Sequence, residues 1–158
     1  MACISNITLL VRSIIGDNVV PYTYTNAQLS TMIVHAAYMI YSNVSFGTAY
    51  TIDIDDETIV PDAESDFVSL IVLKVVCMLL NNEYRIASNK AISVKDGPSS
   101  IDARGVTEAK KLLAENACEQ YTKAELMYNA NNYAAFKAIV GPFNWEGGYS
   151  SDNTERFR

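Results

Sequence analysis

Carboxylate side chains between residues 53 and 64 follow the spacing in this chain that comes nearest to a metal site. Positions one, three, five and twelve of an EF-hand calcium loop fall on four of them: Asp53, Asp55, Glu57 and Glu64. The sixth position, where that loop needs glycine for its sharp turn, is Thr58, and Pro61 stiffens its second half. We therefore interpret the segment as an acidic surface loop that discourages strand-edge pairing or meets a basic partner. A small metal-binding module or hydrolase using these carboxylates is the alternative.

Residues suited to catalysis are sparse. His35 is the one histidine, no Cys or His stands three or four residues from it, and neither a G-x-S-x-G pattern nor a glycine-rich phosphate loop occurs. We interpret His35 as part of a helix-packing seam or a subunit contact. Cys3, Cys77 and Cys118 are interpreted as reduced, buried thiols of a protein made in a cytoplasm. The sequence therefore predicts neither an enzyme nor a cofactor.

Length and charge limit the function classes further. A chain of 158 residues with 49% hydrophobic and 19% charged side chains forms one domain with a real core. The net charge of −6 arises within residues 1–79, which carry two basic and eight acidic side chains, while the remainder carries ten of each. This charge does not favour nucleic-acid binding. The stretch 67–80 is apolar at 12 of 14 positions but contains Lys74, and it is predicted to be a buried element, too short for a membrane anchor.

Hydrophobic periodicity predicts four helices, of which the first covers residues 4–15. Ser5 or Asn6 caps it, Gly16 ends it, and its apolar residues at helical spacing are Ile4, Ile7, Val11 and Ile14. The second begins near Thr25, which forms a capping box with Gln28, and its apolar stripe is Leu29, Met32, Ile33, Ala36, Ala37 and Ile40. The third runs from residue 61 to about 86 and is apolar nearly all round, so other helices or a neighbouring subunit must cover it.

The fourth helix is predicted from residue 106 to about 129. Its inner face is formed by Ala109, Leu113, Ala117, Ala124 and Tyr128, and its outer face carries the i,i+4 ion pairs Lys111/Glu115 and Glu119/Lys123. Before it, residues 92–94 and 99–101 flank a tight turn and can pair as a small hairpin. Residues 51–60 form an extended loop or another short hairpin.

The fold class that follows is mainly all-α. Residues 1–140 form a four-helix domain with a short β-hairpin, and residues 141–158 form an extended C-terminal arm rich in Gly, Ser and Asn. The arm holds large apolar and basic side chains of the kinds that anchor interfaces: Phe143, Trp145, Tyr149, Arg156, Phe157 and Arg158. We predict that the arm orders on another protein, the alternative being that it folds back over its own domain.

The order of these elements resembles the head–tail connector (adaptor) proteins of tailed bacteriophages. Three segments carry the resemblance: the capped second helix YTYTNAQLSTMIVHAAYMI, the apolar third helix DFVSLIVLKVVCMLLNNEYR, and a polar hairpin leading into a long helix, AISVKDGPSSIDARGVTEAKKLLAE. All three fall within residues 22–130. The acidic loop at residues 53–57 has no counterpart in the family pattern.

The resemblance implies a structural virion protein, made in the host cytoplasm, without enzymatic turnover. Such proteins form a homo-oligomeric ring, here a dodecamer, in the virion neck between portal and tail, and DNA passes through the channel without sequence-specific contact. By position, the exposed loop would comprise Lys95, Asp96, Gly97, Pro98, Ser99, Ser100 and Asp102. The arm would dock on the portal protein, other neck or tail proteins would be further partners, and no membrane is involved. Another neck, tail-completion or capsid-associated protein is the alternative.

Overall fold

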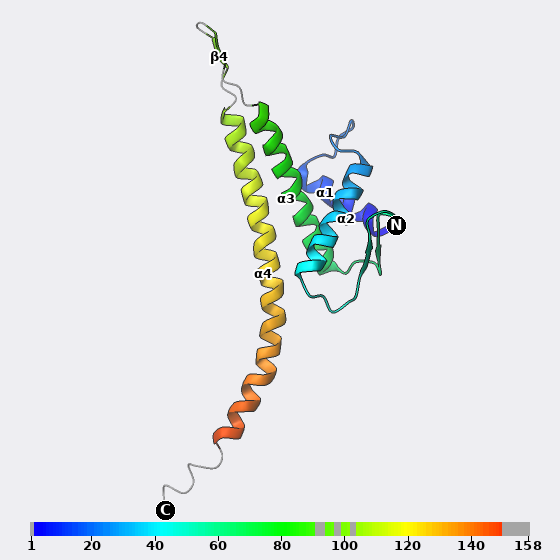
Figure 1. The fold of residues 1–158 in the computed structure, drawn as a ribbon, viewed down its shortest axis with the longest axis vertical. Coiled ribbons are helices and arrows are strands. Elements are labelled where there is room, and N and C mark those ends of the chain that lie inside the picture. The colour runs from blue at the N-terminus through cyan, green and yellow to red at the C-terminus, as the bar shows by residue number, and fades with distance from the viewer. Residues whose placement is uncertain (1, 91–93, 97–98, 102–103, 150–158) are drawn as a thin grey trace, which may run out of the picture. The chain divides into compact units, whose positions relative to one another are not determined.

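A computed structural model describes the backbone of residues 2–90, 94–96, 99–101 and 104–149, and the side chains of residues 4–89 and 105–130. Within these residues the chain forms four helices and two antiparallel hairpins, which confirms the mainly helical fold class (Figure 1). The backbone divides into two compact units, Met1–Ala124 and Glu125–Arg158. The predicted boundary at residue 140 between a domain and a docking arm stays a prediction.

Helix α1 spans Ala2–Ile15 and ends at Gly16, as predicted. Gly16 has φ of +74°, and the Asp17 N–H donates to the Arg12 carbonyl oxygen at 3.0 Å, which closes the last turn. Ile7 and Val11 are buried as expected, but Ile14 is exposed. The predicted caps at residues 5 and 6 are wrong, because the helix begins at Ala2 and includes both.

Helix α2 spans Asn26–Asn43 and begins with the predicted capping box. Thr25 Oγ1 accepts from Gln28 N at 3.2 Å, and Gln28 Oε1 accepts from Thr25 N at 2.9 Å. The predicted apolar stripe is buried except for Met32, which is half-buried. Because α1, α2 and α3 contact one another, this stripe forms the core together with the inner faces of its two neighbours.

Helix α3 spans Ser65–Lys90, with α1 and α2 on one side and the part of α4 before Glu125 on the other (Figure 1). Other helices thus cover it, as expected from an apolar composition on all sides, and Phe67, Ile71 and Leu79 are fully buried. Ser65–Asn89 is long and apolar enough to cross a membrane by length and composition, with mean hydropathy 1.5. The shortness noted in the sequence concerns residues 67–80 alone, whereas the helix extends to Lys90. Core helices meet the same criterion, and 44% of this window is buried.

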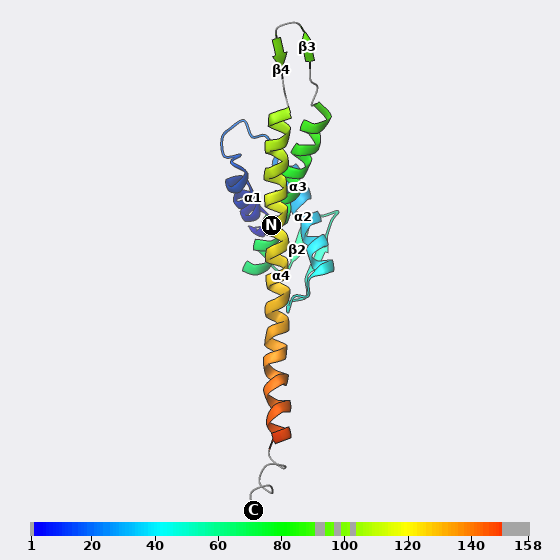
Figure 2. The ribbon, with the colours of Figure 1, turned by 90° about the vertical axis from the view of Figure 1, so that its left-hand side faces the viewer.

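Two hairpins connect the helices. Strands β1 (Thr51–Asp53) and β2 (Thr58–Val60) pair antiparallel between α2 and α3. Strands β3 (Val94–Asp96) and β4 (Ser99–Ile101) pair between α3 and α4 (Figure 2). The predicted second strand, 99–101, is confirmed as β4; β3 begins at Val94, and residues 92 and 93 of the predicted first strand lie outside the described residues. Pairing Asp96 with Ser99 leaves a two-residue connection, the commonest length for a hairpin.

Helix α4 spans Arg104–Tyr149, well beyond its predicted end near residue 129. Propagation of a helix adds one hydrogen bond per residue, and the alanines after position 129 favour it. The helix bounds also include Gly141–Tyr149, the first part of the predicted arm, although Pro142 and the glycines there do not favour a helix. The remaining arm residues, 150–158, lie outside the described part of the chain.

Candidate functional site

Three of the four carboxylates of the calcium-like pattern, Asp53, Glu57 and Glu64, accept hydrogen bonds from different partners. Asp53 Oδ1 accepts from the backbone N–H groups of residues 55 and 56 at 2.9 and 3.1 Å. Glu57 Oε1 accepts from Thr31 Oγ1 on α2 at 2.6 Å, and Glu64 Oε1 accepts from Thr48 Oγ1 at 2.6 Å. Among the described residues, no group of three or more His, Cys, Asp or Glu is placed to hold a metal ion. The structure thus does not bring these carboxylates together as the metal-binding alternative requires.

His35 is exposed on α2, with its Nδ1 2.9 Å from the Thr31 carbonyl oxygen. The interpretation that it sits in a packing seam of its own chain is wrong, because the buried stripe of α2 occupies another face. Its role in a subunit contact stays a prediction.

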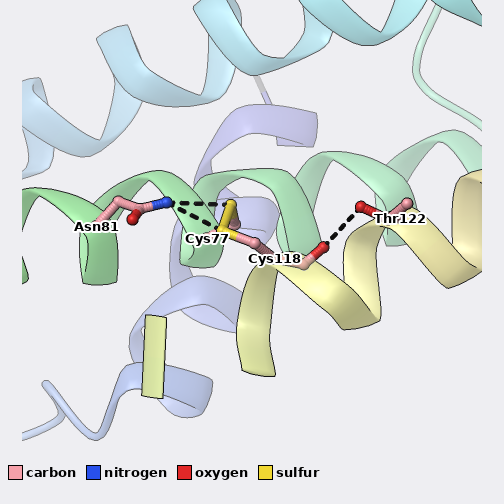
Figure 3. Close-up of a disulfide and its surroundings, with 4 residues drawn as sticks. All are labelled: Cys77, Asn81, Cys118 and Thr122. Carbon is pink, nitrogen blue, oxygen red and sulfur yellow. Dashed lines mark hydrogen bonds between the residues drawn. A yellow bond between two sulfur atoms is a disulfide. The ribbon is translucent and has the colours of Figure 1, made fainter. Parts of the chain in front are cut away.

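Two of the three cysteines form a disulfide that joins α3 to α4. Cys77 on α3 and Cys118 on α4 are bonded, and Asn81 Nδ2 lies 3.7 and 3.0 Å from their respective sulfurs (Figure 3). The prediction of reduced thiols is wrong for this pair. The two residues are 41 positions apart, and only the antiparallel packing of the two helices brings them together. The side chain of Cys3 lies outside the described residues.

Arg12 is the centre of a polar network that sequence reasoning did not identify. Its guanidinium, 4% exposed, donates to Asp17 Oδ2 at 2.7 Å, to the Tyr24 carbonyl oxygen at 2.8 Å and to Asn26 Oδ1 at 2.8 Å. It also lies 4.0 Å from the centre of the Tyr22 ring. Arg12 is the single charged residue of α1, and a lone charge in an apolar helix could have indicated a buried ion pair. The sequence does not indicate which residues pair with it, because the fold brings them together.

Asp17 fixes the loop that joins α1 to α2. Its carboxylate accepts from the N–H groups of Thr23 and Tyr24 at 2.8 and 3.2 Å. The hydrogen bond from the Thr23 N–H, reinforced by that from Tyr24 and by the charge of Arg12, lowers the pKa of Asp17 below its ordinary value.

The network continues to α3 and α4 through Tyr24. Its hydroxyl donates to Glu83 Oε1 at 2.9 Å, and Lys110 Nζ on α4 lies 3.2 Å from Glu83 Oε2. Burial, together with the hydrogen bond to Glu83, raises the pKa of Tyr24. This chain of contacts therefore links all four helices.

The side of α4 that faces α3 differs from the predicted one. Ala114, Ala117 and Tyr121 are buried there, and Lys74 Nζ of α3 lies 4.4 Å from the centre of the Tyr121 ring. Of the predicted inner face, Ala117 alone is buried. The predicted ion pairs do form, with Lys111–Glu115 at 3.9 Å and Lys123–Glu119 at 2.8 Å.

An uncovered apolar stripe results on another side of α4. Val106, Leu112 and Leu113 are 60%, 59% and 56% exposed, and Ala109 is exposed between them. We name these four residues the α4 stripe. Exposed aliphatic side chains in such a contiguous group commonly mark interaction sites.

A second uncovered apolar surface lies on α1. Leu9, Leu10 and Ile14, which we name the α1 patch, are 66%, 48% and 56% exposed. Beside it opens a groove of about 490 Å³, which we name the α1 groove. Its lining includes Ile4, Thr8 and Leu9 of α1, Ser30 of α2, and Asp56 and Glu57 of the β1–β2 turn.

The structure describes only some of the residues predicted to bind partners. In the predicted exposed loop, strand β3 contains Lys95 and Asp96, and strand β4 contains Ser99 and Ser100. The other loop residues, Gly97, Pro98 and Asp102, lie outside the described residues. Phe143, Trp145 and Tyr149 fall within the backbone of α4, and the side chains of the whole arm lie outside the described part.

Comparison of the chain with protein-family models, curated proteins and solved structures finds no match.

Proposed function

We propose that this chain is a structural subunit that assembles into a ring, and that the ring is the head–tail connector of a tailed bacteriophage virion. The observation that carries the proposal is the α4 stripe, which leaves three large aliphatic side chains facing solvent in the single chain. Full burial of one such side chain contributes about 1.5–3 kcal/mol. A neighbouring subunit that covers the stripe recovers this free energy.

The way in which α4 is held supports an assembly role. The Cys77–Cys118 disulfide and the Lys110–Glu83 ion pair tie the first part of α4 to α3. The stripe is thus presented on a supported helix, and an interface that is already ordered loses less conformational entropy on binding. Asp53, Glu57 and Glu64 of the metal-binding alternative, and His35, have local hydrogen bonds, and no group of carboxylates among the described residues is placed to hold a metal ion.

The phage assignment rests on the resemblance of the second helix, the third helix and the hairpin that leads into α4. In this proposal the ring sits in the virion neck, DNA passes through its channel, and the C-terminal arm from Gly141 onward docks on the portal. Aromatic and arginine side chains are the most frequent interface anchors, and the arm contains Phe143, Trp145, Arg156 and Arg158.

The test measures binding to a purified portal ring encoded by the same genome. The full chain is compared with a version ending at Val140 and with full-length Ile86→Ser, a control that changes an exposed apolar residue outside the arm and the α4 stripe. We expect the full chain and Ile86→Ser to bind alike and the shortened chain to bind at least about tenfold more weakly, a loss of about 1.4 kcal/mol. Equal binding by the shortened chain would show that the arm does not dock. Absence of binding by the full chain would refute the connector assignment.

A further inference from the structure

We propose that the Cys77–Cys118 disulfide is a redox latch: when a dithiol reduces it, the first part of α4 separates from α3, while α1, α2 and α3 stay packed together. The part of α4 concerned is residues 104–124, which belong to the same compact unit as the other three helices. The inference concerns the single chain, so it does not depend on the proposed connector function.

Helices α1, α2 and α3 contain a core that does not need α4. The three helices contact one another in every pairing. The largest fully buried side chains among the described residues all lie on them: Ile7, Val11, Leu29, Ile33, Val34, Ile40, Phe67, Ile71, Val75 and Leu79. Because burial of such side chains is the main source of stability, these three helices can stay folded when α4 moves away.

Helix α4 buries little of its own surface against α3. Of the side chains described in α4, three are buried, and two of these are the alanines at positions 114 and 117; the third is Tyr121. Alanine removes little apolar area from water. The Lys110–Glu83 ion pair joins side chains that are 37% and 34% exposed, so solvent weakens it. The covalent bond is therefore the strongest of these links between α4 and α3.

The disulfide lies near enough to the surface for a small thiol to reach it. Cys118 is half-buried, and Asn81, whose Nδ2 lies 3.0 Å from the Cys118 sulfur, is exposed (Figure 3). Asn81 also lines a pocket of about 510 Å³, together with Met78 and Arg85. The guanidinium of Arg85 attracts an approaching thiolate. Cys77 is only 9% exposed, so the sulfur of Cys118 is the one open to attack.

The exchange reaction is complete with a dithiol as reductant. One thiolate of the dithiol attacks Cys118 Sγ, the S–S bond breaks, and its electron pair passes to Cys77 Sγ, which takes a proton from water. The second thiolate of the dithiol then attacks the dithiol sulfur of the mixed disulfide and releases Cys118, which is protonated in turn. The dithiol loses two electrons and becomes a disulfide. Asn81 Nδ2, 3.7 Å from Cys77 Sγ, can donate to the thiolate that forms there.

The state of the latch follows the surroundings of the protein. Thiols keep such bonds reduced in a cytoplasm, whereas the bonds persist in an oxidising compartment. Helix α4 is therefore loose in the first environment and fixed to α3 in the second.

The test compares amide hydrogen exchange of the full oxidised chain with and without dithiothreitol, and mass spectrometry after alkylation counts the free thiols. A helix of this length released from its support is marginal in water, so its amides exchange faster. We expect exchange across residues 104–124 to speed up at least about tenfold on reduction, and exchange across α2 to stay unchanged. The double variant Cys77→Ser/Cys118→Ser should match the reduced protein without dithiothreitol, and Cys3→Ser should respond as wild type does.

Three outcomes would overturn the inference. Equal exchange of α4 in both states would show that packing alone holds it to α3. Equal acceleration in α2 and α4, or a double variant that circular dichroism shows to be unfolded, would show that the three helices do not stand without the bond. A disulfide that dithiothreitol leaves intact in the folded protein would show that no thiol reaches it. None of these measurements involves the portal, so the connector proposal stands or falls separately.

Discussion

Arg12 and Asp17 show how a single ion pair organises the N-terminal part of the chain. Burying a charge is costly unless hydrogen bonds replace its water, and here both partners have several. Arg12 satisfies the Tyr24 carbonyl and Asn26 at the start of α2, while Asp17 receives two backbone N–H groups of the connecting loop. The pair therefore fixes the path of the chain between α1 and α2.

Asp17 should make stability depend on acid pH. Its pKa is lower in the folded protein than its ordinary value of 3.8, so its contribution is fully present above that value and is lost as pH falls through the folded pKa. We expect Asp17→Asn to melt at a lower temperature than wild type near neutral pH, and the difference to shrink below pH 3.8. Melting curves of both proteins across this range check it. A difference that is constant with pH would contradict the assigned role.

Tyr24 offers a second test on the same network. Removing its hydroxyl in Tyr24→Phe leaves Glu83 without one hydrogen bond, and because the Glu83 side chain is 34% exposed, water can partly replace that bond. We expect the free energy of unfolding to fall by about 1 kcal/mol. Urea titration measures the change, with Tyr38→Phe on the exposed face of α2 as control. If Glu83→Ala and Tyr24→Phe have fully additive effects, the two side chains do not interact.

At the scale of elements, the sequence predicts a helix face well when the helix is apolar on one side. The predictions of the apolar stripe and the capping box of α2 are confirmed. They succeed because Thr25, Gln28 and the following apolar positions all indicate the same helix and the same buried face. In α4, aliphatic residues occupy two sides, so spacing alone cannot say which side meets α3. The predicted face around Leu113 is the exposed one, and small residues such as Ala114 and Ala117 allow the close approach to α3.

The sequence could not predict the exposed apolar surfaces or the disulfide, because both depend on how distant segments pack against one another. The acidic residues near position 55 attracted attention by their spacing, yet in the fold they serve a turn and bonds to Thr31 and Thr48. The bond between Cys77 and Cys118 depends on the register of two helices that the β3–β4 hairpin connects. No local pattern encodes such a register.

The disulfide should stabilise the α3–α4 pair substantially. A cross-link that closes a loop of 41 residues removes unfolded-state entropy worth about 4 kcal/mol. We expect Cys118→Ser to lower the free energy of unfolding by up to this amount without reductant, measured by urea titration. With reductant, the variant and wild type should unfold alike. Cys3→Ser serves as the control, and a loss of stability that persists in reductant would assign the effect to packing and not to the bond.

At the scale of the whole molecule, negative charge is concentrated in residues 1–79, and the proposed ring would repeat it in every subunit. Like charge keeps a passing duplex from adhering to a channel wall. We expect duplex DNA to bind with a dissociation constant weaker than about 10⁻⁴ M at physiological salt, the weak end of non-specific binding. Fluorescence anisotropy with labelled duplex checks this. A triple variant, with lysine in place of Asp53, Asp55 and Asp56, should bind more tightly, and micromolar binding by wild type would contradict the role of the charge.

The bond between Cys77 and Cys118 also closes the intervening chain into a covalent loop. Any single peptide-bond cut between these positions would yield two fragments that still migrate as one molecule in denaturing electrophoresis. They would part only after a thiol was added. Nicked chains would therefore run with intact chains unless the sample was reduced before electrophoresis.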